Sequence, residues 1–398
     1  MRKIAIAATA ASLLAWAATA GAAGPIKVGI PLPLTGPEAK FGEIEKRSYE
    51  FAVGEINAAG GVKGMKLELD IQDSQGKPEV SRAIAEKFID VQKYPFILGD
   101  YSSSCSKAVA AVAEERKIPY LVVTGAADDI TKQNYKYVFR LNPSSSYYNS
   151  GLWGFLREVV KPKSVAILYE SSDFGSSGSK AMEKEAKAAG IEVLMNEKYE
   201  KGAVDFKPIL SSLKAKRPDM IYMVSYVMDA SLLMRQIKEL RIDAKLFAGG
   251  AAGFAIPEFI DNAKDASEDV VTSTLWSANV PFKGAKEFAK KYKDKYGDFP
   301  SYHGAEAYSA LYVIADALKR AKSSSVPTPD AIREALKATK MDTAFGSVQF
   351  EDRDGYQNQN FQETLVMQVI KGEHQTIWPK KFASAPYVFP IPAWRDRR

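Results

Sequence analysis

The sequence predicts an α/β protein with two lobes, each a parallel sheet flanked by helices. Short apolar segments alternate with longer segments in which apolar residues recur about every 3.6 positions. This alternation starts again after Pro143. Because the connections are short, it favours parallel sheets with helices on both faces. The chain has 398 residues, more than one hydrophobic core usually supports, so we expect two lobes.

The first series of elements ends near residue 123. Its apolar segments predict buried strands at residues 26–30, 65–71, 96–98 and 118–123. A helix carrying Ile44 and Ile56 separates the first two strands and stops at Gly60, where glycine suits the end of a helix. A second helix opens at Pro78, and a third covers residues 103–116. The pattern is that of consecutive strand and helix units.

The second series follows Pro143. Strands are expected at residues 165–169, 191–194, 220–224 and 245–248, with helices at 178–189, 206–216 and 230–240 between them. Asp205 is placed to cap the second of these helices, and Pro208 stands in its first turn. The chain therefore holds two successive α/β units without a close internal repeat.

The last third of the chain returns to both units. Helices at 285–296, 305–322 and 329–338 follow one another without strands, so they must cover sheets already built. Strands at 348–350 and 364–370 come last. We expect one lobe from residues 24–143 and 278–345, the other from 144–277 and 346–379, and an extended C-terminal tail at 380–398. Several crossings between the lobes would create a hinged cleft.

Composition excludes several classes of protein. Hydrophobic residues make up 46% of the chain and charged residues 26%, so the chain is neither disordered nor fibrous. One Cys forbids an internal disulfide, and two His leave little material for a zinc site. The net charge of +6 is small and no basic stripe stands out, so we expect no nucleic acid partner. We expect neither a cofactor nor a metal.

The N-terminus has the pattern of a secretory signal. Arg2 and Lys3 precede an uncharged apolar run over residues 4–20, and small residues follow at 21–24. A membrane anchor is the alternative, but the run is rich in Ala and barely long enough for a bilayer. We expect residues 1–23 to be removed, with the cleavage position open between Ala20 and Ala23. No Cys lies there, so a lipid anchor is not indicated, and the mature chain is expected to be soluble and exported.

Two polar loops follow neighbouring strands. Residues 99–104, Gly-Asp-Tyr-Ser-Ser-Ser, stand between a strand and a helix, at the edge where parallel sheets bind ligands. Hydroxyls and free backbone N–H groups at a helix start suit a carboxylate, although Ser102 acting only as a helix cap is the alternative. Residues 124–126, Thr-Gly-Ala, follow the next strand, and their small side chains let the backbone approach a ligand. Together the loops predict a binding site for a small anion.

Catalytic motifs are absent from the sequence. It contains no nucleophile elbow, phosphate-binding loop or dinucleotide-binding glycine pattern. Cys105 stands inside a predicted helix start, and His303 or His374 could in principle pair with it, but nothing in the sequence brings them together. Asp352 and Asp354 lack the other ligands of a calcium loop. We expect a binding protein, with a hydrolase based on Ser103 or Cys105 as the alternative.

Several segments resemble the leucine/isoleucine/valine-binding type of periplasmic solute-binding protein. These segments are residues 28–37 (VGIPLPLTGP), 41–42 (FG), 55–64 (EINAAGGVKG), Asp73, 137–140 (YVFR), 173–175 (DFG) and 235–236 (RQ). The resemblance covers almost the whole mature chain. It implies a type I periplasmic binding fold, with two α/β lobes joined by three crossovers that close on a ligand. It also implies a periplasmic location, a monomer, and delivery of the ligand to the permease and ATPase of an ABC importer.

The resemblance assigns ligand-binding positions. Ser103, with Ser104 beside it, corresponds to the hydroxyl and backbone donors for a ligand carboxylate. Thr124, Gly125 and Ala126 match the second ligand loop. Aromatic positions that face the cleft are matched by Phe41, Phe174 and Tyr226, and Tyr101 adds a further ring.

Ala251 departs from the family pattern. Amino-acid-binding members usually carry an acidic residue at this position for the ligand ammonium, and an unpaired buried ammonium is costly. Either another acid such as Asp100, Asp128 or Asp229 substitutes, or the ligand lacks an ammonium. The expected ligand is therefore an amino acid of the branched-chain type or a small carboxylate or amide with an apolar or aromatic body. Sensing of a ligand for a receptor remains an alternative to transport.

Overall fold

Lobe 1 is built on a mostly parallel sheet. The computed structural model describes residues 24–323 and 325–397, and within them this sheet has seven strands in the order β13-β14-β5-β4-β3-β1-β2. The strands are β1 (Ile26–Leu32), β2 (Leu67–Asp73), β3 (Ile97–Leu98), β4 (Tyr120–Val122), β5 (Val138–Arg140), β13 (Glu351–Arg353) and β14 (Tyr356–Gln359). Among these seven strands, only β13 pairs antiparallel, with β14.

Lobe 2 repeats this architecture. Its sheet, also seven-stranded within the described residues, has the order β16-β15-β10-β9-β8-β6-β7. The strands are β6 (Ser164–Glu170), β7 (Glu192–Tyr199), β8 (Met220–Val224), β9 (Leu246–Gly249), β10 (Val271–Thr274), β15 (Leu365–Ile370) and β16 (Glu373–Trp378). β15 runs antiparallel to both β10 and β16. A separate hairpin joins β11 (Lys340–Thr343) and β12 (Gly346–Gln349).

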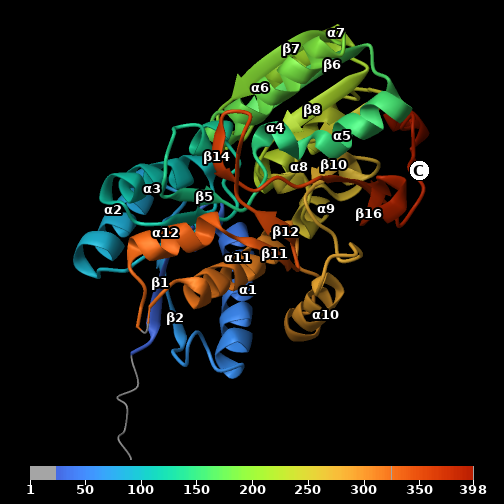
Figure 1. Cartoon of the computed structure of the whole chain (residues 1–398). Helices are drawn as coiled ribbons and strands as arrows, with labels where there is room; N and C mark the ends of the chain where they lie inside the picture. The colour runs from blue at the N-terminus through green and yellow to red at the C-terminus, as the bar shows by residue number, and fades with distance from the viewer. Residues whose placement is uncertain (1–23, 324, 398) are drawn as a thin grey trace, which may run out of the picture.

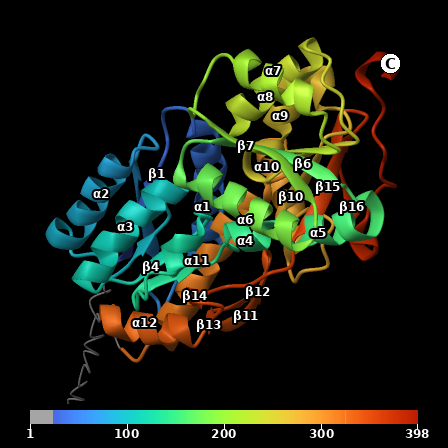
Figure 2. The same ribbon diagram turned by 90° about the horizontal axis from the view of Figure 1, so that it is seen from above.

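Helices flank the sheets in both lobes, as Figures 1 and 2 show. In lobe 1 they are α1 (Ala39–Ala58), α2 (Pro78–Glu86), α3 (Ser103–Arg116), α10 (Ala285–Tyr296), α11 (Tyr302–Arg320) and α12 (Pro329–Lys337). In lobe 2 they are α4 (Ser145–Tyr148), α5 (Ser150–Phe155), α6 (Asp173–Ala188), α7 (Lys207–Lys216), α8 (Val227–Glu239) and α9 (Pro257–Ala263). The fold class predicted from the sequence, two α/β lobes with mostly parallel sheets, is confirmed.

Local sequence explains where the elements begin and end. α1 buries Ile44 and Ile56, whose spacing predicted the helix, together with Phe41 and Ala52. α6 starts five residues before the predicted Gly178, because the Ser172 hydroxyl accepts a hydrogen bond from the Phe174 N–H and caps the helix. The sequence patterns did not predict strands β5 and β10. β5 has only three residues, and β10 reads Val-Thr-Ser-Thr, so neither shows an apolar run.

The chain passes between the sheets after β5, after β10 and after β14. The predicted lobe boundary places the last passage before residue 346. In the structure this passage comes later, after β14. β14 pairs with β5 through Gln359 and Arg140, so β13 and β14 complete the sheet of lobe 1. The buried Gln359 side chain also accepts a hydrogen bond from Arg140 Nε at 2.6 Å. A short hairpin of polar residues carries no sign in the sequence of which sheet it joins.

The C-terminal segment lies along lobe 2. The Trp394 ring stacks on Phe247 with their centroids 5.6 Å apart, and its Nε1 donates a hydrogen bond to the Ile242 carbonyl at 2.8 Å. The Trp394 side chain therefore holds the tail expected at 380–398 against lobe 2, within the described part of that tail, which ends at Arg397. The signal expected at residues 1–23 lies outside the described residues. Among those described, no helix has the length and apolar character needed to span a membrane.

Candidate functional site

A small cavity lies between the lobes, where the carboxyl ends of strands from both sheets meet. Its volume is about 10 Å³, room for about one water molecule. Lobe 1 contributes most of its wall and lobe 2 the remainder. The lining residues are Tyr101, Ser102, Ser103, Thr124, Ala126, Tyr148, Phe174, Tyr226, Ala252, Tyr302 and His303. The two lobes thus nearly meet at this point.

Aromatic rings from the two lobes pack against each other here. Phe41 and Tyr101 of lobe 1 are stacked, with centroids 4.6 Å apart and planes inclined by 10°. Tyr226 of lobe 2 lies 6.2 Å from Phe41 and 6.0 Å from Tyr101, and Phe174 lies 5.5 Å from Tyr226. The rings of both lobes therefore form one continuous apolar surface between the two sheets.

Hydroxyl groups and backbone amides form the polar wall in lobe 1. Ser103 Oγ accepts hydrogen bonds from the N–H groups of Ala126 and Ala127 at 3.1 and 3.0 Å. Its own hydrogen remains for an acceptor such as a carboxylate oxygen. Thr124 Oγ1 lies 2.8 Å from Glu45 Oε1 and 3.1 Å from the Tyr101 carbonyl, and it donates toward these acceptors. The two loops expected from the sequence are thus tied to each other.

Several helices begin at the cavity. α3 starts at Ser103, α6 at Asp173 beside Phe174, α8 directly after Tyr226, and α11 at Tyr302. The N-terminus of a helix carries a partial positive charge and unpaired N–H groups. Their convergence favours a negatively charged group in the cavity.

Buried carboxyl groups surround the same region. Burial raises the pKa of Glu45 to about 8 and that of Asp100 to about 7. Burial also raises the pKa of Glu170, although its carboxylate accepts hydrogen bonds from Ser172 and Gly175 at the start of α6. Burial raises the pKa of Glu306 well above its usual range. Burial therefore favours the neutral form of these acids, while the helix starts keep their partial positive charge.

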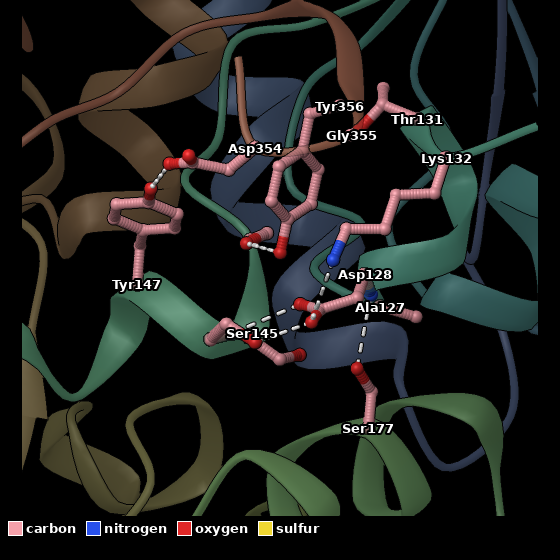
Figure 3. A network of polar contacts seen from close by, with 12 residues as sticks. Ala127, Asp128, Thr131, Lys132, Ser145, Tyr147, Ser177, Asp354, Gly355 and Tyr356 are labelled. Atoms are coloured by element: carbon pink, nitrogen blue, oxygen red, sulfur yellow. Dashed lines mark hydrogen bonds and ion pairs between the residues drawn. The ribbon is translucent and has the colours of Figure 1, made fainter. Parts of the chain in front are cut away.

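Polar contacts join the two lobes around the cavity. Lys201 Nζ lies 3.0 Å from the buried Glu38 Oε1, and Ser104 Oγ donates to Asp173 Oδ2 at 2.7 Å. Figure 3 shows a further contact at the rim, where Ser177 of α6 faces the backbone of Asp128, whose N–H donates to Ser177 Oγ at 3.0 Å. Each of these contacts crosses from one lobe to the other.

The structure brings most of the predicted site residues to the cavity. Tyr101, Ser103, Thr124, Ala126, Phe174 and Tyr226 line it, and Phe41 packs directly behind Tyr101. The other predicted residues do not line it. Ser104 bonds to Asp173, and Gly125 lies so close to Ser106 that a Cβ would be 2.5 Å from the Ser106 hydroxyl. Ala251 is fully buried with φ of +62°, and the next residue, Ala252, forms the wall instead.

Sequence reasoning missed part of the wall. Tyr148, Tyr302 and His303 come from segments that follow no predicted strand, so the rule that located the two loops could not find them. Ser102, weighed as a helix cap, lines the cavity and makes no side-chain cap hydrogen bond. A Pro-Ser pair at 300–301 before a helix start was the only signal for Tyr302.

The groups considered for catalysis are poorly suited to it. Cys105 is fully buried, and burial raises the pKa of its thiol, so the thiolate is disfavoured. Burial lowers the pKa of His303 to about 3. His374 Nε2 lies 2.8 Å from the Phe254 carbonyl in lobe 2.

Comparison with known proteins identifies the family. Residues 25–373 match the periplasmic binding protein family. The chain belongs to this family. A Leu/Ile/Val-binding protein homolog of Brucella melitensis is 31% identical over 396 residues, which cover 95% of this chain and 97% of the relative.

Solved structures share the fold. A leucine-binding protein, LivK, from Thermotoga maritima superposes with a TM-score of 0.80 at 25% identity, covering 88% of this chain and 97% of that one. A solute-binding protein of an ABC transporter from Rhodopseudomonas palustris, in complex with 3,4-dihydroxybenzoic acid, gives 0.76 at 22% identity, covering 89% and 96%. The expected type I periplasmic binding fold is confirmed, and the family supports a solute-binding role for this protein. The family and these neighbours are binding proteins rather than enzymes.

Proposed function

We propose that this protein captures an amino acid of the branched-chain type, or a related small carboxylate, between its lobes by hinge closure. The observation that supports this most directly is the cavity itself, which is lined by both lobes and combines hydroxyls, helix N-termini and aromatic rings. In this proposal the ligand carboxylate meets Ser103 and the N-terminus of α3. Its apolar body lies among Phe41, Tyr101, Phe174 and Tyr226.

We also propose where the protein acts and with which partners. The N-terminal signal exports it to the periplasm as a monomer, and its closed form delivers the ligand to an ABC permease driven by an ATPase. The Brucella relative is named for Leu, Ile and Val, and the Thermotoga neighbour for leucine, which supports the branched-chain ligand class.

An aromatic carboxylate is the second candidate ligand. It is favoured by the number of rings at the cavity and by Ala251 and Ala252, which provide no carboxylate in lobe 2. The Rhodopseudomonas protein holds such a ligand in the same fold. An aromatic ring would stack between Tyr101 and Tyr226 more completely than an aliphatic side chain.

A thermal-shift screen of residues 24–398 tests the proposal. The panel contains leucine, isoleucine, valine, their 2-oxo acids, benzoate and hydroxybenzoates. A true ligand at 100 times its dissociation constant should stabilise the protein by about 2.7 kcal/mol. X-ray scattering with and without that ligand should show a smaller radius of gyration in its presence. A panel without any stabilising compound, or turnover of a bound compound, contradicts the proposal.

Ser103→Ala locates the site. Loss of a hydrogen bond to a charged group should weaken carboxylate binding by about 1 to 3 kcal/mol, measured by calorimetry. Ser211→Ala, which removes an exposed hydroxyl in α7, serves as the matched control and should bind normally. Unchanged affinity in Ser103→Ala would remove this residue from the site.

A further inference from the structure

Glu306 is a buried acid without a hydrogen-bond partner. It is fully buried in α11, and neither carboxylate oxygen has a partner among the residues that the structure describes. A carboxyl group in that position costs free energy, because it has lost water and gained nothing in return. Such a group needs an explanation beyond packing.

The Glu306 side chain lies next to the cavity. It stands one helical turn after Tyr302 and His303, on the same face of α11, and both of those residues line the cavity. Side chains in a helix lean toward its N-terminus, so the carboxyl group of Glu306 is directed back to this wall. Burial raises the pKa of Tyr148 and Tyr302, both cavity residues, and an ionised Glu306 adds to this effect, so its carboxyl group lies near them. The carboxyl group is therefore behind the tyrosine wall.

The other buried acids near the cavity are already engaged. Glu38 pairs with Lys201, and Glu45 accepts from Thr124. Asp100 accepts from Ser81 Oγ at 2.7 Å, and Glu170 from the amides at the start of α6. Glu306 differs from these acids because no described residue hydrogen-bonds to its carboxyl group.

The acids considered as substitutes for Ala251 are engaged as well. Asp128 accepts from the Ser146 N–H at 3.0 Å, and Asp229 from the Gly202 N–H at 3.0 Å. His303, with its low pKa, is neutral near pH 7 and brings no positive charge to the wall. Among these acids, Glu306 is therefore the one whose carboxyl group, unengaged by any described residue, is free to accept a cation that the ligand brings.

We propose that Glu306 accepts the positively charged amino group of the ligand, from lobe 1, in place of the acid that position 251 lacks in lobe 2. This inference rests on the proposed function and selects the amino acid over the carboxylate without an amine. The ligand carboxylate lies at Ser103 and the start of α3, and its ammonium reaches Glu306 past Tyr148 and Tyr302 when the rings separate. Burial favours the neutral form of Glu306, and the arriving ammonium favours the ionised form, so ligand binding supplies the missing partner and releases the proton of the carboxyl group to solvent.

The test compares ligands that differ only in the amine. Leucine and 4-methylpentanoate, and phenylalanine and 3-phenylpropanoate, are titrated into residues 24–398 by calorimetry. The wild type should bind the amino acid of at least one pair about 10- to 100-fold more tightly. Glu306→Gln should lose most of this preference, through weaker binding of the amino acid, while affinity for the deaminated compound stays within about threefold.

Two further variants keep the result interpretable. Glu55→Gln removes a lobe 1 carboxylate that bonds Tyr308 and Tyr312 away from the cavity, and it should keep the wild-type preference. If Glu306→Gln does not fold, Glu306→Asp retains the charge at a shorter reach and should reduce the preference without abolishing it. An unchanged ratio in the Glu306 variants, or a wild type that binds both compounds equally, overturns this inference alone. A wild type that binds neither compound of either pair overturns the inference together with the amino acid function.

Discussion

Glu45 makes the stability of this protein depend on pH in a predictable direction. Its carboxyl group is fully buried in α1, accepts a hydrogen bond from Thr124 and lies 3.3 Å from the Tyr49 hydroxyl. Burial raises its pKa from 4.5 to about 8, and the charge of Asp100 adds to this effect. Glu45→Gln replaces the carboxyl group by a neutral side chain of the same shape, which retains both contacts.

The sign follows from the two pKa values. Below pH 4.5 the carboxyl group is protonated in both the folded and the unfolded chain, and its contribution to stability is fully present. As pH rises toward 8, the unfolded chain loses the proton while the folded chain keeps it, so stability falls. The slope is about 1.4 kcal/mol per pH unit, or roughly 3 kcal/mol between pH 5 and pH 7. Glu45→Gln lacks this contribution.

Urea unfolding at pH 5, 6 and 7 measures the effect. The free energy of unfolding of Glu45→Gln, relative to the wild type, should increase by about 3 kcal/mol from pH 5 to pH 7. Glu50→Gln, at an exposed position of the same helix, should show a difference from the wild type that does not change with pH. A constant difference for Glu45→Gln would refute the reasoning, because Glu45 would then be ionised in the folded chain.

Three further predictions concern closure, packing and reactivity. Lys201→Met removes the partner of buried Glu38 across the lobes, so calorimetry should show that ligand affinity falls by about 1 to 3 kcal/mol. An unchanged affinity would show that this pair does not stabilise closure. Gly42→Ala places a Cβ 1.8 Å from the Pro33 carbonyl oxygen, so the free energy of unfolding in urea should fall by about 2 kcal/mol or more. A smaller decrease would mean that the backbone at Pro33 moves aside at little cost. Cys105 should not react with a thiol reagent in the native protein but should react fully in urea, and rapid native labelling would contradict its burial.

Local pattern accounts for most of the fold. Apolar runs and helical periodicity located most of the strands and helices of both lobes, because burial on a sheet or helix face leaves a regular trace in the sequence. Among the elements that escaped prediction, β5, β10 and the β13–β14 hairpin are short or polar. Their place is set by pairing with distant strands, as Gln359 pairs with Arg140, and such pairing has no local signal.

The same division holds for the site. Ser103 and Thr124 follow strands in the sequence, and since parallel strands end at one edge of a sheet, their proximity could be expected from the order of residues alone. Only the tertiary structure brought Tyr148, Tyr302 and His303 to the same cavity, and it put Ala252 rather than Ala251 at the wall. It also showed that Glu306 is buried without a partner among the described residues. By itself, the sequence determined the two-lobed α/β fold class and the family, and it located the two polar loops, because all of these depend on local order. The charge balance in the cavity depends on which distant side chains meet, and the fold alone decided that.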